Sequence, residues 1–205
     1  MKPLCIHLLE SLFDSVEIGH DLSLLELDMI DSGFGNIRST QSFDLDKIKK
    51  YKDDYSYVFV SNFLKNKALP VESFGGWKNI DLGYMDSHSL VLWSLSSKAF
   101  SYYTAFFFWS YFCNKKNLLR TKIFFSVYLT LLNPLKDNLE IDDSKFSMYD
   151  CFNSKQMRAI RFFIYKITKD HDLEKNDRDF LENSYIYFWS SIDLILKDRR
   201  FYDVF

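Results

Sequence analysis

Two clusters of acidic side chains have the residue type and spacing that acid–base chemistry could use. They consist of Glu140, Asp142 and Asp143, and of Asp170, Asp172 and Glu174. Carboxyl groups held together in a cleft can exchange protons with a substrate. Both clusters fall in expected loops between helices, where charged side chains are usually solvated. We therefore interpret these six residues as candidate contacts for a partner, and we assign no catalytic residue.

The histidines and cysteines do not follow the spacing of a metal site. They are His7, His20, His88 and His171, and Cys5, Cys113 and Cys151. The sequence contains no H-E-x-x-H and no C-x-x-C, the spacings that typically bind zinc. Cys5 and His7 are two residues apart and would point to different sides of a helix, which disfavours a nucleophile–base pair. An odd number of scattered cysteines indicates free, reduced thiols and no metal.

Glycine-rich nucleotide motifs are incomplete in this chain. Gly33 and Gly35 form G-x-G, but Arg38 stands where the third glycine of the dinucleotide fingerprint belongs. The sequence has no Gly-Lys-Ser/Thr, which a Walker loop needs, and no G-x-S-x-G around a hydrolase serine. We therefore expect no cofactor and a protein that is not an enzyme.

Composition indicates a folded, mainly helical chain. Aromatic residues make up 19% of the 205 residues and the net charge is −2, which is unlike a disordered protein. Only 6 glycines and 3 prolines occur, so sharp turns are few. The sequence pI of about 6.1 also disfavours direct binding of nucleic acid, which requires a basic surface.

Apolar spacing predicts an all-α fold of about seven or eight helices in a single domain, residues 1–205. Expected helices cover about 3–18, 22–30, 45–66, 90–93, 97–113, 118–132, 154–169 and 180–195. Residues 22–30 also alternate as a strand would, so a short strand in the N-terminal third stays an alternative to the favoured helix. We expect turns at 114–117, and the helices at 98–113 and 118–132 should be central.

Local signals also predict helix caps and core residues. Ser96 or Ser97, and Asn153 or Ser154, are side chains that favour helix N-termini, and Asp21 could cap the helix at 22–30. Trp77 should fill the core beneath a loop. The expected buried residues are Trp93, Phe107, Ile123, Val127, Ile160, Ile164 and Phe188.

The longest uncharged segment is too short to span a membrane. Ala99–Cys113 is uncharged for 15 residues, whereas a spanning helix needs about 20 apolar residues. No cleavable signal is visible at the N-terminus. We expect a cytoplasmic protein without membrane contact, with membrane association through Ala99–Cys113 as the remaining alternative.

Two segments resemble an uncharacterised family of small bacterial helical proteins. They are Phe100–Phe106 (FSYYTAF) and Phe152–Phe163 (FNSKQMRAIRFF), with Trp77 about 25 residues before the Tyr102–Tyr103 pair. The resemblance covers about residues 70–168 and implies a helical fold without catalytic residues. The chain departs from the family at Thr104, where a proline is usual.

By size and type the chain also resembles bacterial toxin-immunity proteins, as in toxin–antitoxin and contact-dependent growth inhibition systems. That resemblance implies a non-enzymatic protein that neutralises a cognate toxin, for example a basic nuclease. The acidic loops would suit the positive cleft of such a toxin. The alternative hypothesis is a small-ligand-binding protein or an enzyme, with a pocket between aromatic helices.

Overall fold

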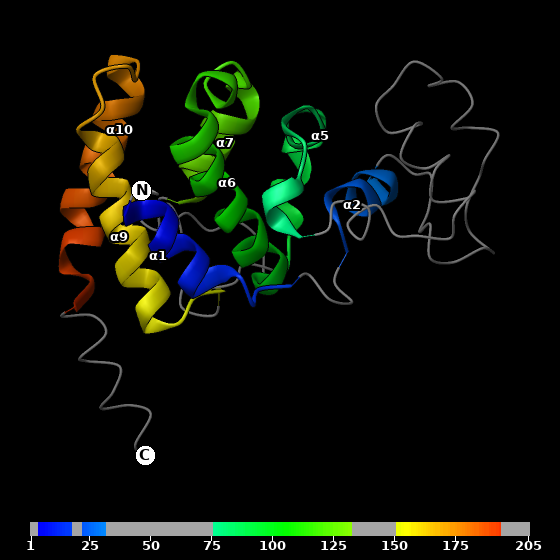
Figure 1. Cartoon of the computed structure of the whole chain (residues 1–205). Coiled ribbons are helices and arrows are strands. Elements are labelled where there is room, and N and C mark those ends of the chain that lie inside the picture. Colours follow the sequence, from blue (N-terminus) through cyan, green and yellow to red (C-terminus); the bar gives the residue numbers. More distant parts are fainter. Residues whose placement is uncertain (1–3, 18–21, 32–75, 133–150, 194–205) are drawn as a thin grey trace. The chain divides into compact units, whose positions relative to one another are not determined.

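The computed structural model describes residues 4–17, 22–31, 76–132 and 151–193 (Figure 1). Helices account for most of these residues, and none of them lies in a strand. The predicted all-α fold is therefore confirmed. The chain divides into two compact units. One combines residues 1–15 with residues 128–205, and the other comprises residues 16–127. The expectation of a single domain stays a prediction.

The unit of residues 1–15 and 128–205 is built on helix α9, Ser154–Thr168. Asn153 caps its first turn by accepting hydrogen bonds from the Lys155 and Gln156 amides, both at 3.0 Å. The Gln156 side chain in turn accepts a hydrogen bond from the Asn153 amide. This reciprocal pair satisfies backbone N–H donors that a helix N-terminus otherwise leaves without partners. Of the two alternatives predicted for this cap, Asn153 and Ser154, the structure confirms Asn153.

The apolar stripe of α9 is buried as its spacing predicts. Ile160, Ile164 and Ile167 are each 0% exposed and Met157 is 1% exposed. Removing such side chains from water contributes about 1.5–3 kcal/mol each. Tertiary burial of this face, more than helix propensity, therefore stabilises α9.

Helix α1, Leu4–Phe13, packs on α9. Its buried residues are Ile6, Leu9 and Phe13. The buried side of the helix is therefore shifted by about one residue from the apolar stripe that the spacing suggested, which consists of Cys5, Leu8, Leu9 and Leu12. The Gln156 amide donates a 3.0 Å hydrogen bond to the Leu12 carbonyl near the end of α1. This bond satisfies one of the carbonyls that a helix C-terminus leaves unpaired.

Helix α10, Lys175–Tyr187, follows α9 through a short turn and packs against it. The 3-10 helix η6, Trp189–Ser191, comes next. Trp189 is 0% exposed, and its indole N–H donates a 3.1 Å hydrogen bond to the Leu132 carbonyl. Arg158 and Arg161 of α9 both bind Asp193, at 2.7 and 2.6 Å, and their hydrogen bonds lower the pKa of that carboxyl.

The unit of residues 16–127 contains most of the other described elements. They are α2 (Leu24–Asp31), η3 (Trp77–Asn79), α5 (Leu82–Ser87), η4 (Ser89–Ser94), α6 (Ser97–Leu118) and the start of α7 (Lys122–Leu131). Of the ambiguous segment 22–30, residues 24–30 are therefore helical, as favoured. The division between the two units falls within α7.

Helix α6 is buried on nearly every side. Phe100, Phe106, Phe107 and Phe108 are each at most 1% exposed. Ser96 caps this helix by accepting a hydrogen bond from the Ala99 amide. The predicted turn at 114–117 is only a kink, because Asn114 alone has non-helical angles (φ −141°, ψ 38°) and the helix resumes to Leu118.

Helix α7 corrects one core prediction. Ile123 is 56% exposed and Val127 is half-buried, whereas Phe124 and Phe125 are buried. Phe124 and Phe125 both contact the Phe107 ring of α6. The polar residues Lys122, Ser126 and Thr130 recur every four residues, next to Ile123 and Val127, so the sequence does carry a periodic signal that this side faces outward. The core prediction overlooked this signal.

The short helix η4 corrects a second core prediction. Trp93, expected to be buried, is 48% exposed, and Leu90 is 77% exposed. Residues three apart eclipse each other in a 3-10 helix. The two side chains therefore share an outward face, while Leu92 and Leu95 are buried.

Trp77 is 3% exposed, as predicted for a residue that fills the core. Phe107, Ile160 and Ile164 are also buried as expected, and Phe188 is half-buried. The predicted helix at 45–66 lies outside the described residues. Within the described ranges, no helix combines the length and the hydropathy that crossing a membrane requires.

Ile160→Ala should lower the free energy of unfolding by about 2–5 kcal/mol, because it removes a fully buried side chain and leaves a cavity. Ile186→Ala is the matched control: Ile186 is 56% exposed, and its change should be within about 0.5 kcal/mol. Urea denaturation followed by circular dichroism measures both. Equal losses in the two variants would contradict the assignment of the α9 core.

Candidate functional site

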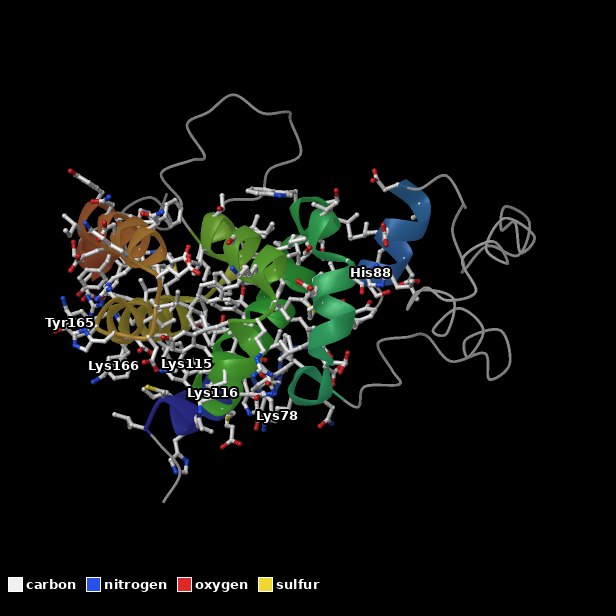
Figure 2. All side chains as sticks on the ribbon, turned by 90° about the horizontal axis from the view of Figure 1, so that it is seen from above. Lys78, His88, Lys115, Lys116, Tyr165 and Lys166 are labelled. Carbon is white, nitrogen blue, oxygen red and sulfur yellow. The ribbon has the colours of Figure 1, made fainter. Side chains whose placement is uncertain are left out.

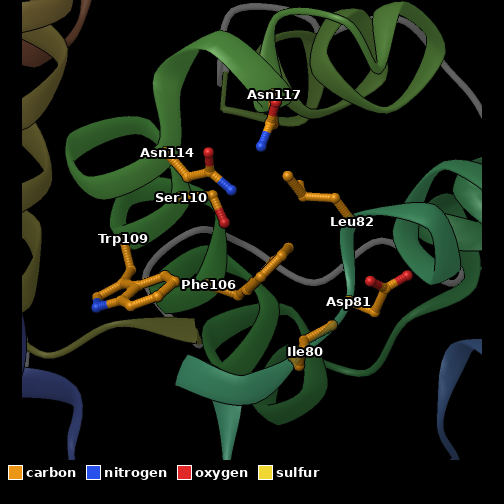
Figure 3. Close-up of a pocket in the computed structure, with 8 residues that line it drawn as sticks. All are labelled: Ile80, Asp81, Leu82, Phe106, Trp109, Ser110, Asn114 and Asn117. Carbon is orange, nitrogen blue, oxygen red and sulfur yellow. The ribbon is translucent and has the colours of Figure 1, made fainter.

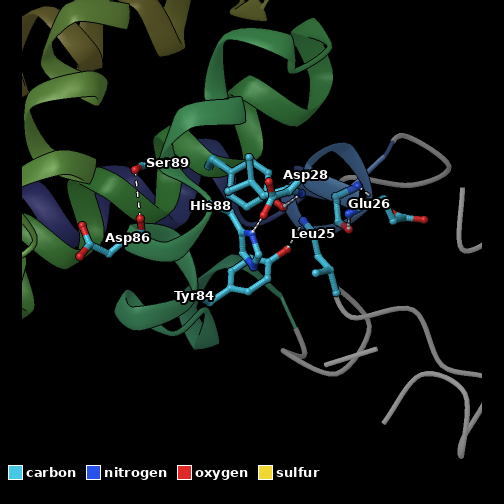
Figure 4. Close-up of polar contacts among 10 residues, drawn as sticks. Leu25, Glu26, Asp28, Tyr84, Asp86, His88 and Ser89 are labelled. Atoms are coloured by element: carbon cyan, nitrogen blue, oxygen red, sulfur yellow. Dashed lines mark hydrogen bonds and ion pairs between the residues drawn. The ribbon is translucent and has the colours of Figure 1, made fainter. Parts of the chain in front are cut away.

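A buried polar cluster surrounds the N-terminus of α2 (Figure 4). The Ser23 amide donates a 2.7 Å hydrogen bond to the Glu26 carboxylate, and the Glu26 amide donates to the Ser23 hydroxyl at 3.3 Å. Both residues are 0% exposed. Ser23-x-x-Glu26 is thus a capping box. Sequence reasoning chose Asp21 and missed this pattern, although the motif is legible in the sequence.

Two tyrosine hydroxyls complete the cap of α2. The Leu24 amide donates to Tyr103 of α6 at 3.2 Å, and the Leu25 amide donates to Tyr84 of α5 at 3.0 Å. Burial raises the pKa of both phenols well above the ordinary value, so they stay protonated. Helix α2 is therefore held by hydrogen bonds to side chains 59 and 79 residues away.

His88 adds a side-chain hydrogen bond to this cluster. Its Nδ1 contacts the Asp28 carboxylate of α2, and its ring meets the Tyr84 ring edge-on at 4.9 Å. Nε2 has no hydrogen-bond partner among the described residues. His88 is only 1% exposed, so a substrate cannot reach that nitrogen in this conformation. We interpret the cluster as the attachment of α2 and not as a catalytic dyad.

A pocket of about 340 Å³ lies between α6 and the segment that enters α5 (Figure 3). Its lining residues are Ile80, Asp81, Leu82, Phe106, Trp109, Ser110, Asn114 and Asn117. This volume is within the usual range for small-molecule sites, about 300–1,000 Å³. None of these residues was predicted to form a site, because only the fold brings residues 80–82 beside α6.

Exposed aromatic and aliphatic side chains occupy the outer side of the α9–α10 hairpin. Tyr165 contacts Tyr185 at 5.5 Å between ring centroids, and the Lys169 ammonium lies 5.7 Å from the Tyr165 ring. Lys169 also binds Glu182 at 3.3 Å. We call this surface the hairpin face, defined as Phe162, Tyr165, Lys166, Lys169, Glu182, Tyr185 and Ile186. Figure 2 shows Tyr165 and Lys166 on the outer side of α9.

The predicted acidic contacts at Asp170, Asp172 and Glu174 lie in the turn at the tip of this hairpin. Asp172 and Glu174 are exposed, and Asp170 accepts a 3.0 Å hydrogen bond from the Asp172 amide. Burial, and then the nearby Glu174 charge, raises the pKa of Asp177 in the first turn of α10. Glu140, Asp142 and Asp143 lie outside the described residues.

The three cysteines differ in how far solvent reaches them. Cys5 is half-buried, Cys113 exposed and Cys151 buried. Burial is the main cause that raises the pKa of the Cys5 thiol, which opposes formation of a reactive thiolate. No group of three potential metal ligands occurs within residues 4–17, 22–31, 76–132 and 151–193.

Comparisons with protein-family models, curated proteins and solved structures find no match to this chain. The resemblance over residues 70–168 and the likeness to immunity proteins therefore stay predictions.

Tyr84→Phe and Tyr103→Phe should each lower the free energy of unfolding by about 1–3 kcal/mol, because each leaves a buried amide of α2 without an acceptor. Tyr102→Phe is the matched control. The Tyr102 hydroxyl is buried and has no hydrogen-bond partner among the described residues, so its removal should be neutral or stabilising. Denaturant titration distinguishes the variants, and a loss of similar size at Tyr102 would contradict the capping role.

Stability should also decrease at alkaline pH through Tyr102. Burial, with a smaller effect of the Glu17 charge, raises the pKa of Tyr102 to about 12. Between pH 10 and 12 the unfolded chain releases this proton while the folded chain retains it, so the free energy of unfolding falls as pH rises. The decline should be shallower in Tyr102→Phe, and identical profiles for the two proteins would refute the shift.

Proposed function

We propose that this protein acts by binding another protein, and that it is an immunity protein for a bacterial toxin. The observation that carries the proposal is the exposed, partly aromatic hairpin face. Tyr165 is 41% exposed and Ile186 is 56% exposed, and Tyr187 beside the face is 69% exposed. Tyrosine is enriched where proteins bind one another, since it combines a large apolar ring with a polar hydroxyl.

The rigid support of the hairpin face favours an interface. The buried isoleucines of α9 hold the opposite side of that helix, and α10 packs against it. Tyr165 contacts the Tyr185 ring, and the Lys169 ammonium lies 5.7 Å from the Tyr165 ring. A preorganised aromatic side chain loses little conformational entropy on binding, which increases the affinity available from its contacts.

The tip of the hairpin gives this surface an acidic edge. Residues 169–179 contain five acids (Asp170, Asp172, Glu174, Asp177, Asp179) and three bases (Lys169, Lys175, Arg178), so the segment carries a net charge of −2. An acidic edge would attract the positive cleft of a nuclease toxin and increase the association rate. Charge complementarity thus supports a basic nuclease as the partner.

Tyr165→Ala should weaken the complex with the toxin at least about tenfold, as expected when a central aromatic contact is lost. Trp93→Ala is the control, because Trp93 is an exposed aromatic of the other unit at 48% exposure. The full-length protein is co-produced with the product of the adjacent gene. Affinity purification, calorimetry and growth in the presence of the toxin then measure binding and protection.

A tight one-to-one complex with restored growth, weakened by Tyr165→Ala and unaffected by Trp93→Ala, would support the proposal. A second variant pair, Asp172→Asn with Glu174→Gln, should slow association and reduce its dependence on salt. Absence of both complex and protection would overturn the immunity function. A complex that is insensitive to Tyr165 would instead overturn the hairpin face as its binding surface.

A further inference from the structure

We infer that the corner between α6 and α7 binds the surface of a lipid bilayer that contains anionic phospholipids. We call residues 115–123 the α6–α7 corner, because they form the last turn of α6, the connection and the first two residues of α7. The corner belongs to the unit of residues 16–127, whereas the hairpin face belongs to the other unit. The inference goes beyond the proposed protein-binding function and does not depend on it.

Acidic side chains are absent from a long part of this unit's sequence. Residues 87–127 contain no aspartate or glutamate, although these two types account for 28 of the 205 residues of the chain. The same segment carries five bases, four of them in the corner, so its formal charge is +5 while that of the whole chain is −2. Residues 169–179, by contrast, mix five acids with three bases. A strong local excess of positive charge favours a polyanionic partner.

The bases of the corner are placed where a partner can reach them. Lys116, Arg120 and Lys122 are exposed and Lys115 is half-buried. Lys115 and Lys122 also have interaction partners within the protein, so Lys116 and Arg120 are the side chains most available to a lipid headgroup. In Figure 2, Lys115 and Lys116 lie on the same side of the view as Lys78 of η3.

Helix stability alone does not account for this cluster. Lys115 and Lys116 stand in the last turn of α6, where positive charge favours the negative end of the helix dipole. Lys122 is the first residue of α7, where the same dipole makes positive charge unfavourable. A cluster that continues into an unfavourable position indicates a role beyond that of a helix cap.

Two carboxylates approach the corner from the region of α5. Asp86 accepts a 3.3 Å hydrogen bond from the Phe124 amide of α7, and Asp81 lines the same pocket as Asn117. Counting these two acids against the four bases leaves a formal charge of +2 around the corner. The surface therefore stays positive after its acidic neighbours are included.

An exposed aliphatic side chain beside these bases selects the kind of polyanion. Ile123 is 56% exposed and Leu119 is half-buried. The phosphates of a nucleic acid attract bases but gain nothing from an isoleucine. At a bilayer surface, bases bind the anionic headgroups while neighbouring apolar side chains enter the boundary between headgroups and acyl chains. The combination therefore favours a lipid surface over a nucleic acid.

The contact is peripheral and differs from the one that the sequence left open. Most of Ala99–Cys113 is buried within α6, including Phe100 and Phe106 at 1% exposure each, so this segment is not available to lipid. Binding through the corner leaves α6 inside its unit. The expectation of no membrane contact is thus replaced by contact at the surface of a bilayer.

The test uses the full-length protein and vesicles of two compositions, phosphatidylcholine alone and an equal mixture of phosphatidylcholine and phosphatidylglycerol. At low salt the protein should sediment with the anionic vesicles and not with the neutral ones. Raising the salt concentration to about 0.5 M should release it, because salt screens the attraction between exposed bases and lipid headgroups.

Lys116→Glu with Arg120→Glu should weaken partitioning onto anionic vesicles at least about 25-fold, since each base near an anionic surface contributes about fivefold. Lys155→Glu with Lys175→Glu is the matched control. It changes the net charge by the same amount through two exposed lysines of the other unit, and it should have a much smaller effect.

Ile123→Ser should weaken the same partitioning about threefold or more, by loss of apolar contact with the bilayer. Ile186→Ser is its matched control, because Ile186 is also 56% exposed but lies in the other unit. Circular dichroism verifies that each variant is folded.

Three outcomes would overturn the inference: no sedimentation with anionic vesicles, equal sedimentation with neutral vesicles, or equal losses in the corner variants and their controls. Binding of a short double-stranded DNA that competes with the vesicles, together with no effect of Ile123→Ser, would overturn the bilayer as the partner of the corner. Selective, salt-sensitive partitioning that is weakened by both corner variants would support it.

Discussion

Burial of α6 on nearly all sides is the constraint on which the unit of residues 16–127 depends. A helix with aromatic side chains all round can be stable in water only if other elements cover it. Helix α7 contributes Phe124 and Phe125 against Phe107, and η3 packs along the same helix. The polar groups of α6 that remain inside must then find partners, since an unpaired buried group is costly.

That requirement links α6 to α2. The Tyr103 hydroxyl accepts from Leu24, while Tyr84 of α5 does the same for Leu25. A short helix of 8 residues has little stability of its own. Its position therefore depends on caps supplied by residues remote in sequence. The same α6 provides a stripe of serine and asparagine where its aromatic character ends, and the pocket beside residues 80–82 forms there.

The other unit uses a simpler arrangement. One amphipathic helix, α9, buries its isoleucines inward and presents arginine, lysine and tyrosine outward. Two of the outward arginines are held by Asp193, and Lys169 is held by Glu182 and Tyr165. These basic side chains are thus partly neutralised by acids 13 to 35 residues away. The outward side is left with fixed aromatic rings at its centre.

The sequence by itself determined the helical class, the stripe of α9, the caps at Ser96 and Asn153, and the burial of Trp77, because these follow from local spacing and local hydrogen bonds. The inward side of α7 was also legible, because Lys122, Ser126 and Thr130 recur every four residues on its outward side. Tertiary structure alone decided the exposure of Trp93, since a 3-10 turn shares no period with an α-helix. It also decided the cap of α2 by Tyr84 and Tyr103, and the pocket between α6 and residues 80–82. Both join residues far apart in the chain, and no local pattern encodes which distant side chain will meet them.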